Sequence, residues 1–483
     1  MKTMDILELL KDYIILGLKI LIPVAIIFFI AYGLIYKKMI KGTKTISKSK
    51  LLLCAISICY IVIVIGATFF SRQSTETYND TLNLNLFSSY REAYHDIGVS
   101  LLNNILVRNL ILNIMLFIPL GFLLPLYSDK LKKMYRVVLI GFLATLTIEL
   151  TQHFNDYGVF EIDDVFNNTL GTLLGYCCFM IFYKIKNKEN WKKIIGYIIP
   201  FILTVGAFIG IYITYQVQEF GNFTFEHNYR INMNNVDVQS EVEFPNERSI
   251  ADIYYIHTLE EKETRQIAQK LFERVGKCID DNETKEFENT ISYWTSGDTQ
   301  ENETSYYAAI KYIGGAYEYK DSSDLIIKDG NIEFLDTIDN ASREEVEIAL
   351  QNLGIQVPEN AKFEQNERKN YIFSINKQTQ GNKLIDGSLE CRYYEDKTVK
   401  YVNNNILSYE KVKGKEIKSE KEAYEEILAG EFKAFTSNEI NSIVVNGVQL
   451  EYQVDSKGYY VPVYKFDVLL NESKNTIYIK AIK

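Results

Sequence analysis

A series of long apolar runs, confined to the first 215 residues, restricts the fold of this chain more than any other feature. Six runs approach the roughly 20 residues that an α-helix needs to cross a bilayer. They lie at Tyr13–Tyr36, Leu51–Phe70, Leu106–Tyr127, Val137–Thr151, Val165–Tyr183 and Ile194–Tyr215. The fourth run reaches this length only with polar flanking residues up to about Phe154. We therefore expect a membrane domain of six spanning helices in residues 1–215.

The charge of the chain changes sign where the apolar runs end. Residues 1–215 contain 21 Lys and Arg and 14 Asp and Glu, a net charge of +7. Residues 216–483 contain 31 Lys and Arg and 48 Asp and Glu, a net charge of −17. Such a break indicates a domain boundary, and the acidic second part argues against binding to nucleic acid. Because this part has no run of membrane length, we expect it to fold as a soluble domain.

Basic residues are concentrated in alternate loops between the runs, and cytoplasmic loops are the ones rich in Lys and Arg. The residues concerned are Lys37, Lys38, Lys41, Lys44, Lys48, Lys50, Lys130, Lys132, Lys133, Arg136, Lys184, Lys186, Lys188, Lys192 and Lys193. The first run is not expected to be a cleaved signal peptide, because acidic residues precede it. The pattern predicts a multi-pass protein of the cell membrane, with both termini and residues 216–483 outside the cell.

Polar residues interrupt three of the runs near their expected outer ends. At membrane depth such groups cost a few kcal/mol each unless paired, which makes them candidate site residues. The candidate ligand-binding residues are Asn109, Asn113, Glu149, Gln152, Asp163, Asp164 and Asn168. If the site is catalytic, the candidates are Glu149, His153, Asp163 and Asp164. No zinc or EF-hand spacing is present in the sequence, so we expect no metal ion and no cofactor.

These residues also have a structural interpretation. Asp163 or Asp164 could cap the fifth helix, where a carboxylate complements the helix dipole. Asn109 and Asn168 could join helices by hydrogen bonds, and Gly171 and Gly175 predict close helix packing. A purely structural network, however, would not need Glu149, Gln152 and His153 as well.

Residues 61–186 contain three motifs in order: NLILN at Asn109–Asn113 followed by LFIPLGFLLP, IELTQ at Ile148–Gln152, and FEIDDVFNNTLGTLLGY at Phe160–Tyr176. Together these motifs resemble the VanZ-like family. The resemblance implies a cell-envelope membrane protein linked to glycopeptide resistance and teicoplanin tolerance, without an established catalytic mechanism. An arginine often precedes the acidic motif in the family, but Gly158 and its neighbours stand there in this chain. Arg72, Arg91 or Arg108 could supply that charge.

The pattern of residues 216–483 predicts an extracellular α+β domain. It would consist of helix-plus-antiparallel-sheet repeats at residues 248–337, 341–413 and 417–483. The expected helices are Leu259–Ile279, Ser342–Leu353 and Lys418–Leu428. Ser342 and Glu345 form a capping-box pattern. Strands near the C-terminus resemble PepSY-like exported modules of Gram-positive bacteria. Cys278 and Cys391 would either form a disulfide or remain free thiols.

Three functional hypotheses follow. The first is an envelope protein that lowers sensitivity to lipoglycopeptide antibiotics such as teicoplanin. Its outer site would bind a membrane lipid, a lipid-linked peptidoglycan precursor or the lipoglycopeptide, with amides hydrogen-bonding the ligand and carboxylates pairing with its amines or a protein arginine. The second is an intramembrane enzyme, in which paired carboxylates divide the acid and base roles. The third is an envelope sensor, whose residues 216–483 bind a protein partner.

Overall fold

The computed structural model describes Lys19, Pro23 and residues 47–70, 82–96, 105–155, 158–227, 229–287, 289–295, 306–328, 331–434 and 440–482. The chain divides into two compact units. The helical unit comprises residues 1–94 and 105–217, and the sheet unit comprises residues 95–104 and 218–483. Apart from Lys19 and Pro23, the expected first span at Tyr13–Tyr36 lies outside the described residues.

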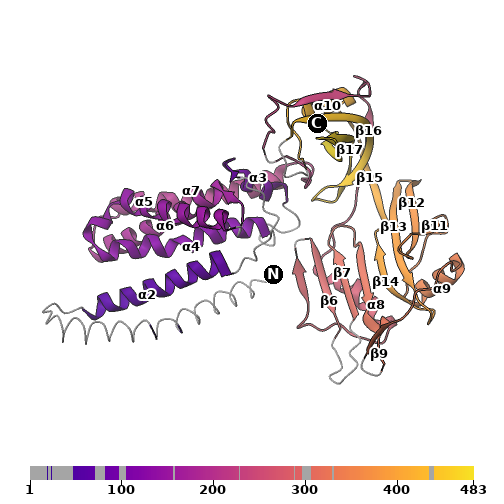
Figure 1. The fold of residues 1–483 in the computed structure, drawn as a ribbon, viewed down its shortest axis with the longest axis horizontal. Coiled ribbons are helices and arrows are strands. Elements are labelled where there is room, and N and C mark those ends of the chain that lie inside the picture. Colours follow the sequence, from indigo (N-terminus) through magenta and orange to yellow (C-terminus); the bar gives the residue numbers. More distant parts are fainter. Residues whose placement is uncertain are drawn as a thin grey trace. The chain divides into compact units, whose positions relative to one another are not determined.

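Five long helices dominate the described part of the helical unit (Figure 1). They are α2 (Lys48–Ile65), α4 (Ile105–Tyr127), α5 (Met134–Phe154), α6 (Ile162–Lys186) and α7 (Lys192–Val217), and a π-helical turn η2 (Gly66–Phe70) extends α2. Each of the five is long and apolar enough to cross a membrane. Five of the six expected spans therefore coincide with described helices. A short helix α3 (Ser88–His95) and a two-residue parallel pairing of β1 (Leu82–Asn83) with β2 (Phe160–Glu161) were not expected from the sequence.

Short connections set the directions of α4, α5, α6 and α7. A 3-10 turn η3 (Asp129–Lys132) links α4 to α5, and similarly short segments link the later pairs. Helices joined in this way are antiparallel neighbours, so α4 and α6 run parallel to each other. The starts of α4 and α6 and the end of α5 consequently share one end of the unit, which we call the polar end. The basic residues of the η3 segment and of the α6–α7 connection lie at the opposite end.

Glycine allows α4 and α6 to approach within backbone contact. A Cβ atom added to Gly171 would lie 2.1 Å from the carbonyl oxygen of Ile114, and one added to Gly175 would lie 1.9 Å from that of Ile118. On α4, a Cβ atom added to Gly121 would lie 1.9 Å from the carbonyl oxygen of Thr172. Side chains have no room at these positions, which is the usual reason for small residues between membrane helices. The packing role predicted for Gly171 and Gly175 is confirmed.

The sheet unit is built on one 14-stranded sheet. The main path has the order β3-β16-β17-β4-β15-β13-β14-β8-β7-β6-β5; β12 pairs with β13, β11 with β12, and β18 with β17. Neighbouring strands are antiparallel except for β3 and β16. The strands are β3 (Asp237–Ser240), β4 (Ile250–Tyr255), β5 (Lys285–Phe287), β6 (Thr290–Trp294), β7 (Tyr306–Lys311), β8 (Tyr317–Asp321), β11 (Lys362–Gln365), β12 (Tyr371–Gln380), β13 (Lys383–Tyr393), β14 (Val399–Asn404), β15 (Leu407–Glu416), β16 (Ser442–Val454), β17 (Tyr459–Leu470) and β18 (Ser473–Lys480), with a separate hairpin of β9 (Leu325–Lys328) and β10 (Asn331–Phe334).

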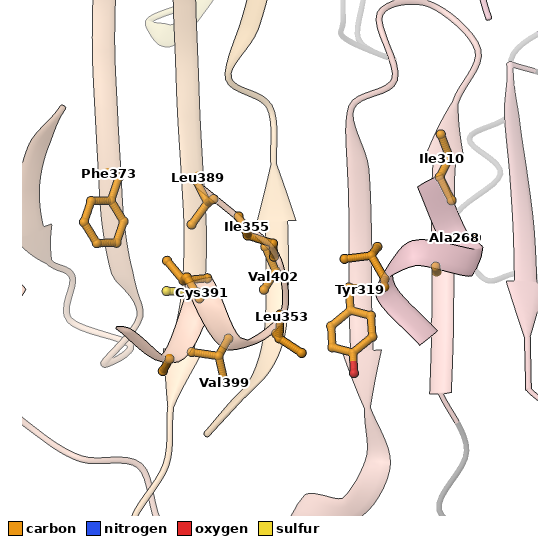
Figure 2. Packing of buried hydrophobic residues seen from close by; sticks show 14 of the residues in the cluster. Ala268, Ile310, Tyr319, Leu353, Ile355, Phe373, Leu389, Cys391, Val399 and Val402 are labelled. Carbon is orange, nitrogen blue, oxygen red and sulfur yellow. The ribbon is translucent and has the colours of Figure 1, made fainter. Parts of the chain in front are cut away.

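Three helices accompany this sheet: α8 (Glu261–Arg274), α9 (Arg343–Asn352) and α10 (Glu420–Leu428). The predicted capping box at Ser342 and Glu345 is confirmed, and α10 begins with another. One hydrophobic core contains side chains of α8 and α9 together with strands β6–β8 and β12–β14. Figure 2 shows Ala268, Leu353 and Cys391 within this core. The predicted segments 248–337 and 341–413 thus share a core, and their description as repeats stays a prediction.

The two cysteines of the sheet unit are free thiols in different surroundings. Cys391 is fully buried in the core, whereas Cys278 is exposed. Burial also raises the pKa of the Cys391 thiol to about 12. A buried thiol with a raised pKa is inert, so Cys391 acts as a small core hydrophobe.

We expect Gly171→Ala to destabilise the helical unit, because the added methyl group would force α4 away from α6. Overpacking of this kind costs about 1–3 kcal/mol. The matched control is Gly206→Ala on α7, where nothing lies within 4 Å of an added Cβ atom. The measurement is thermal unfolding of the full-length protein in detergent. Equal stability of the two variants would contradict the packing described for α4 and α6.

Candidate functional site

Polar residues of several segments gather at the polar end, around the first two turns of α6. This helix begins after Glu161 and carries Asp163, Asp164, Asn167 and Asn168 in those turns. Carboxylates are favourable at this position because they complement the positive end of the helix dipole. No side-chain hydrogen bond caps the start of α6 within the described structure. The sequence suggested that Asp163 or Asp164 would cap α6. In the structure these acidic residues have other roles.

Asp163 caps the short helix α3 instead. Its Oδ1 accepts a hydrogen bond from the backbone N–H of Phe87 at 2.6 Å, and its Oδ2 accepts one from that of Ser89 at 2.8 Å. These amides belong to the start of α3, where the first N–H groups of a helix have no partner inside the helix. The Asp163 side chain is only 1% exposed. With both oxygens occupied, Asp163 serves primarily to hold α3.

Further contacts fix α3 against the start of α6. The Ser89 hydroxyl donates to Glu161 Oε2 at 3.2 Å, and the Tyr90 hydroxyl donates to Asn167 Oδ1. The Phe87 ring meets Phe166 edge to face, with 5.3 Å between ring centroids. Ser89, Tyr90 and Glu161 were not predicted from the sequence as members of this cluster. Glu161 lies within the FEIDD motif, so its acidity next to Asp163 and Asp164 was the available signal.

The carboxyl group of Glu161 lies just before the membrane-length part of α6. Burial raises its pKa to about 7, and the nearby charges of Asp164, Asp163 and Glu92 act in the same direction. The hydrogen bond from Ser89 opposes this shift. Glu161 can therefore exchange a proton near neutral pH, which an ordinary glutamate does not do.

Asn113 links α4 to the cluster. Its Nδ2 donates to Asp164 Oδ1 at 2.6 Å, and both side chains are partly buried. Asn109, one turn earlier on α4, is exposed. The structure thus brings Asn113 and Asp164 together and leaves Asn109 apart from them.

Helix α5 contributes Glu149 and Gln152, whose side chains are 3% and 2% exposed. Gln152 Nε2 donates to the backbone carbonyl of Thr68 in η2 at 2.7 Å. His153 is only partly buried, and its ring lies 5.5 Å from that of Phe154 between centroids. His153 is therefore less enclosed than its two neighbours on α5.

Asn168 joins α6 to α5 through its Nδ2, which donates to Thr145 Oγ1 at 2.8 Å. Three buried amide atoms of the cluster have no hydrogen-bond partner among the residues that the structure describes: Gln152 Oε1, Asn167 Nδ2 and Asn168 Oδ1. Buried polar atoms without partners are uncommon in proteins and call for an explanation. The amide groups of Gln152, Asn167 and Asn168 therefore each have one atom that forms a hydrogen bond and one that has no partner among the described residues.

The chemistry available at the polar end is hydrogen bonding and charge pairing. Carboxylates and amides dominate it, and the described residues contain no group of three or more His, Cys, Asp and Glu side chains arranged to hold a metal ion. A polar headgroup or a small charged species could bind to such groups. Of the catalytic candidates, Asp163 already has both oxygens bound to backbone amides.

Helices long and apolar enough to cross a membrane, with a cluster of polar side chains at one end, are features of a helical membrane protein. Comparison with known families makes this more specific, because residues 52–183 match the model of the VanZ/LLP1 family. This range includes most of α2 and α6 and all of α4 and α5, and it contains the three motifs that suggested the resemblance. The predicted VanZ-like similarity is confirmed over this part of the chain. It fits a membrane protein of the cell envelope.

The comparisons add little for the remainder of the chain. No curated protein matches the chain. A solved structure described as the Bacillus megaterium YpeB C-terminal domain is 14% identical, with a TM-score of 0.18, and the match covers 47% of this chain and 95% of that one. A likeness at this level carries no conclusion about the sheet unit, and the PepSY-like resemblance stays a prediction.

We expect Asp163→Ala to release α3 from α6. Loss of a capping carboxylate costs about 1–2 kcal/mol, so amide hydrogen exchange in residues 88–95 should become about tenfold faster. The control is Asp129→Ala, which removes an exposed carboxylate paired with Lys132 at 2.6 Å at the opposite end. Hydrogen exchange with mass spectrometry measures both. Unchanged exchange in α3 would contradict the capping role.

We expect the stability of the helical unit to fall as the pH rises from about 4.5 to about 7, with Glu161 as one cause. The folded state holds the Glu161 proton up to a pKa of about 7, whereas the unfolded chain releases it near 4.5. The unfolded state then binds fewer protons in this window, so stability decreases as pH increases. Glu161→Gln should raise the melting temperature relative to wild type more at pH 8 than at pH 5. An equal effect at both pH values would argue against a raised pKa.

Proposed function

We propose that this chain is a VanZ-like envelope membrane protein that lowers sensitivity to lipoglycopeptide antibiotics such as teicoplanin. The ligand of its polar end is a lipid-linked peptidoglycan precursor, a membrane lipid or the lipid-tailed antibiotic itself. The single observation that carries the proposal is the set of half-satisfied amides beside Asp164. A network that served packing alone would pair these atoms, because each unpaired buried group costs about 1–3 kcal/mol.

The position of the cluster supports a site at the outer membrane surface. The polar end and the basic residues of the helix connections lie at opposite ends of the helical unit. Because basic loops favour the cytoplasmic side, the polar end faces outward in this proposal, with both termini outside the cell. Lipid-linked cell-wall precursors and lipid-tailed glycopeptides carry their polar groups at this depth.

The accessible part of the cluster would make the first contact with a ligand. Asn113, Glu161 and Asp164 are partly buried and offer both donors and acceptors. The fully buried Asn167 and Asn168 lie one helical turn deeper on α6, since residues three and four apart share a helix face. A headgroup entering at Asp164 would therefore meet amides next. We further propose that the sheet unit binds an envelope protein partner.

An intramembrane enzyme is the less favoured alternative. An acid–base pair needs a carboxyl group that is free to exchange its proton with substrate. Asp163 is bound by two backbone amides. The remaining candidates supply no evident nucleophile among the described residues of this cluster, so binding explains the side chains more simply than catalysis.

We expect wild-type protein to lower teicoplanin susceptibility in a sensitive Gram-positive host, and Glu149→Gln and Asp164→Asn to lose this protection. Both substitutions keep the size of the side chain and remove its charge. The control is Asp129→Asn at the opposite end, which should protect like wild type. Minimum inhibitory concentrations of teicoplanin and vancomycin are measured at matched protein levels. If wild-type protein changes neither value, the proposed resistance function is wrong.

A further inference from the structure

One face of the large sheet carries a continuous row of aromatic and cationic side chains. The row crosses five consecutive strands, β6, β7, β8, β14 and β13 (Figure 1). Trp294 pairs with Tyr307, Tyr307 with Lys320, Lys320 with Tyr401, and Tyr401 with Arg392. Residues directly opposite each other on neighbouring strands lie on the same face of a sheet and close together. We call these five residues the aromatic–cationic row.

The row lies on the face of the sheet opposite to the core. Side chains alternate between the two faces along a strand. The sequence neighbours Tyr293, Tyr319 and Cys391 are buried in the core that includes α8 and α9. The three aromatic residues of the row are half-buried, Arg392 is exposed, and the Lys320 side chain is 56% exposed. The row is therefore part of the surface of the sheet unit.

Contacts within the row hold its rings and charges in place. The ring centroids of Trp294 and Tyr307 are 5.0 Å apart. Lys320 Nζ lies 5.8 Å from the ring centroid of Tyr307 and 5.9 Å from that of Tyr401, and the Arg392 guanidinium lies 5.2 Å from that of Tyr401. Side chains that are already ordered lose less conformational entropy when a ligand binds.

The cations of the row retain donors for a ligand. Lys320 forms an ion pair with Glu318, and Arg392 Nε donates to Asn370 Oδ1 at 2.8 Å. An ammonium and a guanidinium group each have several N–H donors, so these contacts use only part of them. Lys285 of β5 adds a third cation, 5.5 Å from the ring of the tryptophan.

Polar side chains accompany the row, two residues further along the same strands. They are Ser292, Glu318, Asn403 and Glu390, which continue the same strand register on the same face. Their hydroxyl, carboxylate and amide groups can form hydrogen bonds with alcohols. The surface thus combines flat rings, cations and hydrogen-bonding groups in two parallel lines.

This combination matches a polysaccharide. The C–H face of a sugar ring packs on an aromatic ring, and its hydroxyl groups bond to carboxylates and amides. Neighbouring strands lie ~4.8 Å apart, which is close to the length of one sugar in an extended chain. Lys320 and Arg392 are two strands apart, so their charges match an acidic group on every second sugar. We propose that the aromatic–cationic row binds an extended polysaccharide with this repeat.

The linear shape of the row favours a chain polymer over a protein surface. Trp, Tyr and Arg are also common in protein interfaces, but there they cluster near the centre of a patch. The net charge of −17 in residues 216–483 argues against nucleic acid. The inference rests on the outside location proposed for the sheet unit and not on the resistance function. Glycan strands of the cell wall, freed of their peptides, have a carboxylate on every second sugar and serve as the probe.

The test uses Trp294 as its own reporter. The chain has two tryptophans, so Trp191→Phe leaves Trp294 as the only one. Full-length Trp191→Phe protein in detergent is titrated with the peptide-free glycan strands, and tryptophan fluorescence is recorded. We expect a saturable change, with affinity that falls as salt is added because charges contribute. Chitin oligosaccharides have a similar backbone without the carboxylates and should bind about tenfold more weakly.

Variants locate the binding surface. Lys320→Gln combined with Arg392→Gln should weaken binding of the glycan strands about tenfold. Lys474→Gln, at an exposed position on β18, should bind like the parent protein. Tyr401→Leu should also weaken binding about tenfold, whereas Tyr229→Leu at an exposed position outside the row should not. Melting temperatures confirm that each variant is folded, and the charge variants test the proposal if Tyr401→Leu is not.

Three results would overturn the proposal. The first is the absence of saturable binding by the glycan strands, which would leave the row as a protein interface or a surface feature. The second is equal binding by the row variants and their controls. The third is equal binding of a polyol-phosphate polymer, which has charge but no chain of sugar rings. Because no antibiotic is used, glycan binding and teicoplanin protection can each be lost without the other.

Discussion

The backbone contact between α4 and α6 is the constraint on which the helical unit depends. Gly121, Gly171 and Gly175 bring the two parallel helices together without intervening side chains. This contact fixes their relative position, so that Asn113 of α4 reaches Asp164 of α6 at 2.6 Å. In a lipid environment apolar burial does not drive helices together, so close packing and polar contacts must do so. The same glycines that stabilise the unit therefore also determine which polar groups meet.

The acidic start of α6 shows how neighbouring carboxylates can have different roles. Asp163 is stabilised by two backbone amides of α3, which supply the compensation that a buried carboxylate requires. Asp164 points to α4 instead, and Glu161 meets the Ser89 hydroxyl. Because the first is largely satisfied by the backbone, the ligand binding proposed above would involve the other two. The local geometry of α3 is thus a condition for the behaviour of the whole cluster.

The sequence predicted those features that depend on local patterns. Apolar run lengths located the five described long helices, and the α5 run extends to Phe154 as expected. The capping box at Ser342 and the packing of Gly171 also followed from short-range rules. In strand β16 the pairing with β17 continues across a register shift between Val445 and Gly447. A bulge of this kind leaves the hydrophobic alternation broken although the pairing persists.

What the sequence could not predict depends on contacts between distant residues. Helix α3 lies in a loop that carries no long apolar run, and its capping residue is more than seventy positions away. Asn109 and Asn113 are four residues apart and looked equivalent, yet only Asn113 lies where α6 approaches α4. Sequence spacing shows which side chains share a face, but not which face a neighbouring helix will cover.

The unsatisfied amides separate a binding site from a structural network more clearly than the acidic residues do. Carboxylates at a helix start have an ordinary explanation in the helix dipole and in capping, as Asp163 illustrates. An amide that donates through its nitrogen while its buried oxygen has no donor has no such explanation. Gln152 on α5 and Asn168 on α6 share this arrangement. Because no described residue donates to these two oxygens, any further partner would donate a hydrogen bond or carry a positive charge.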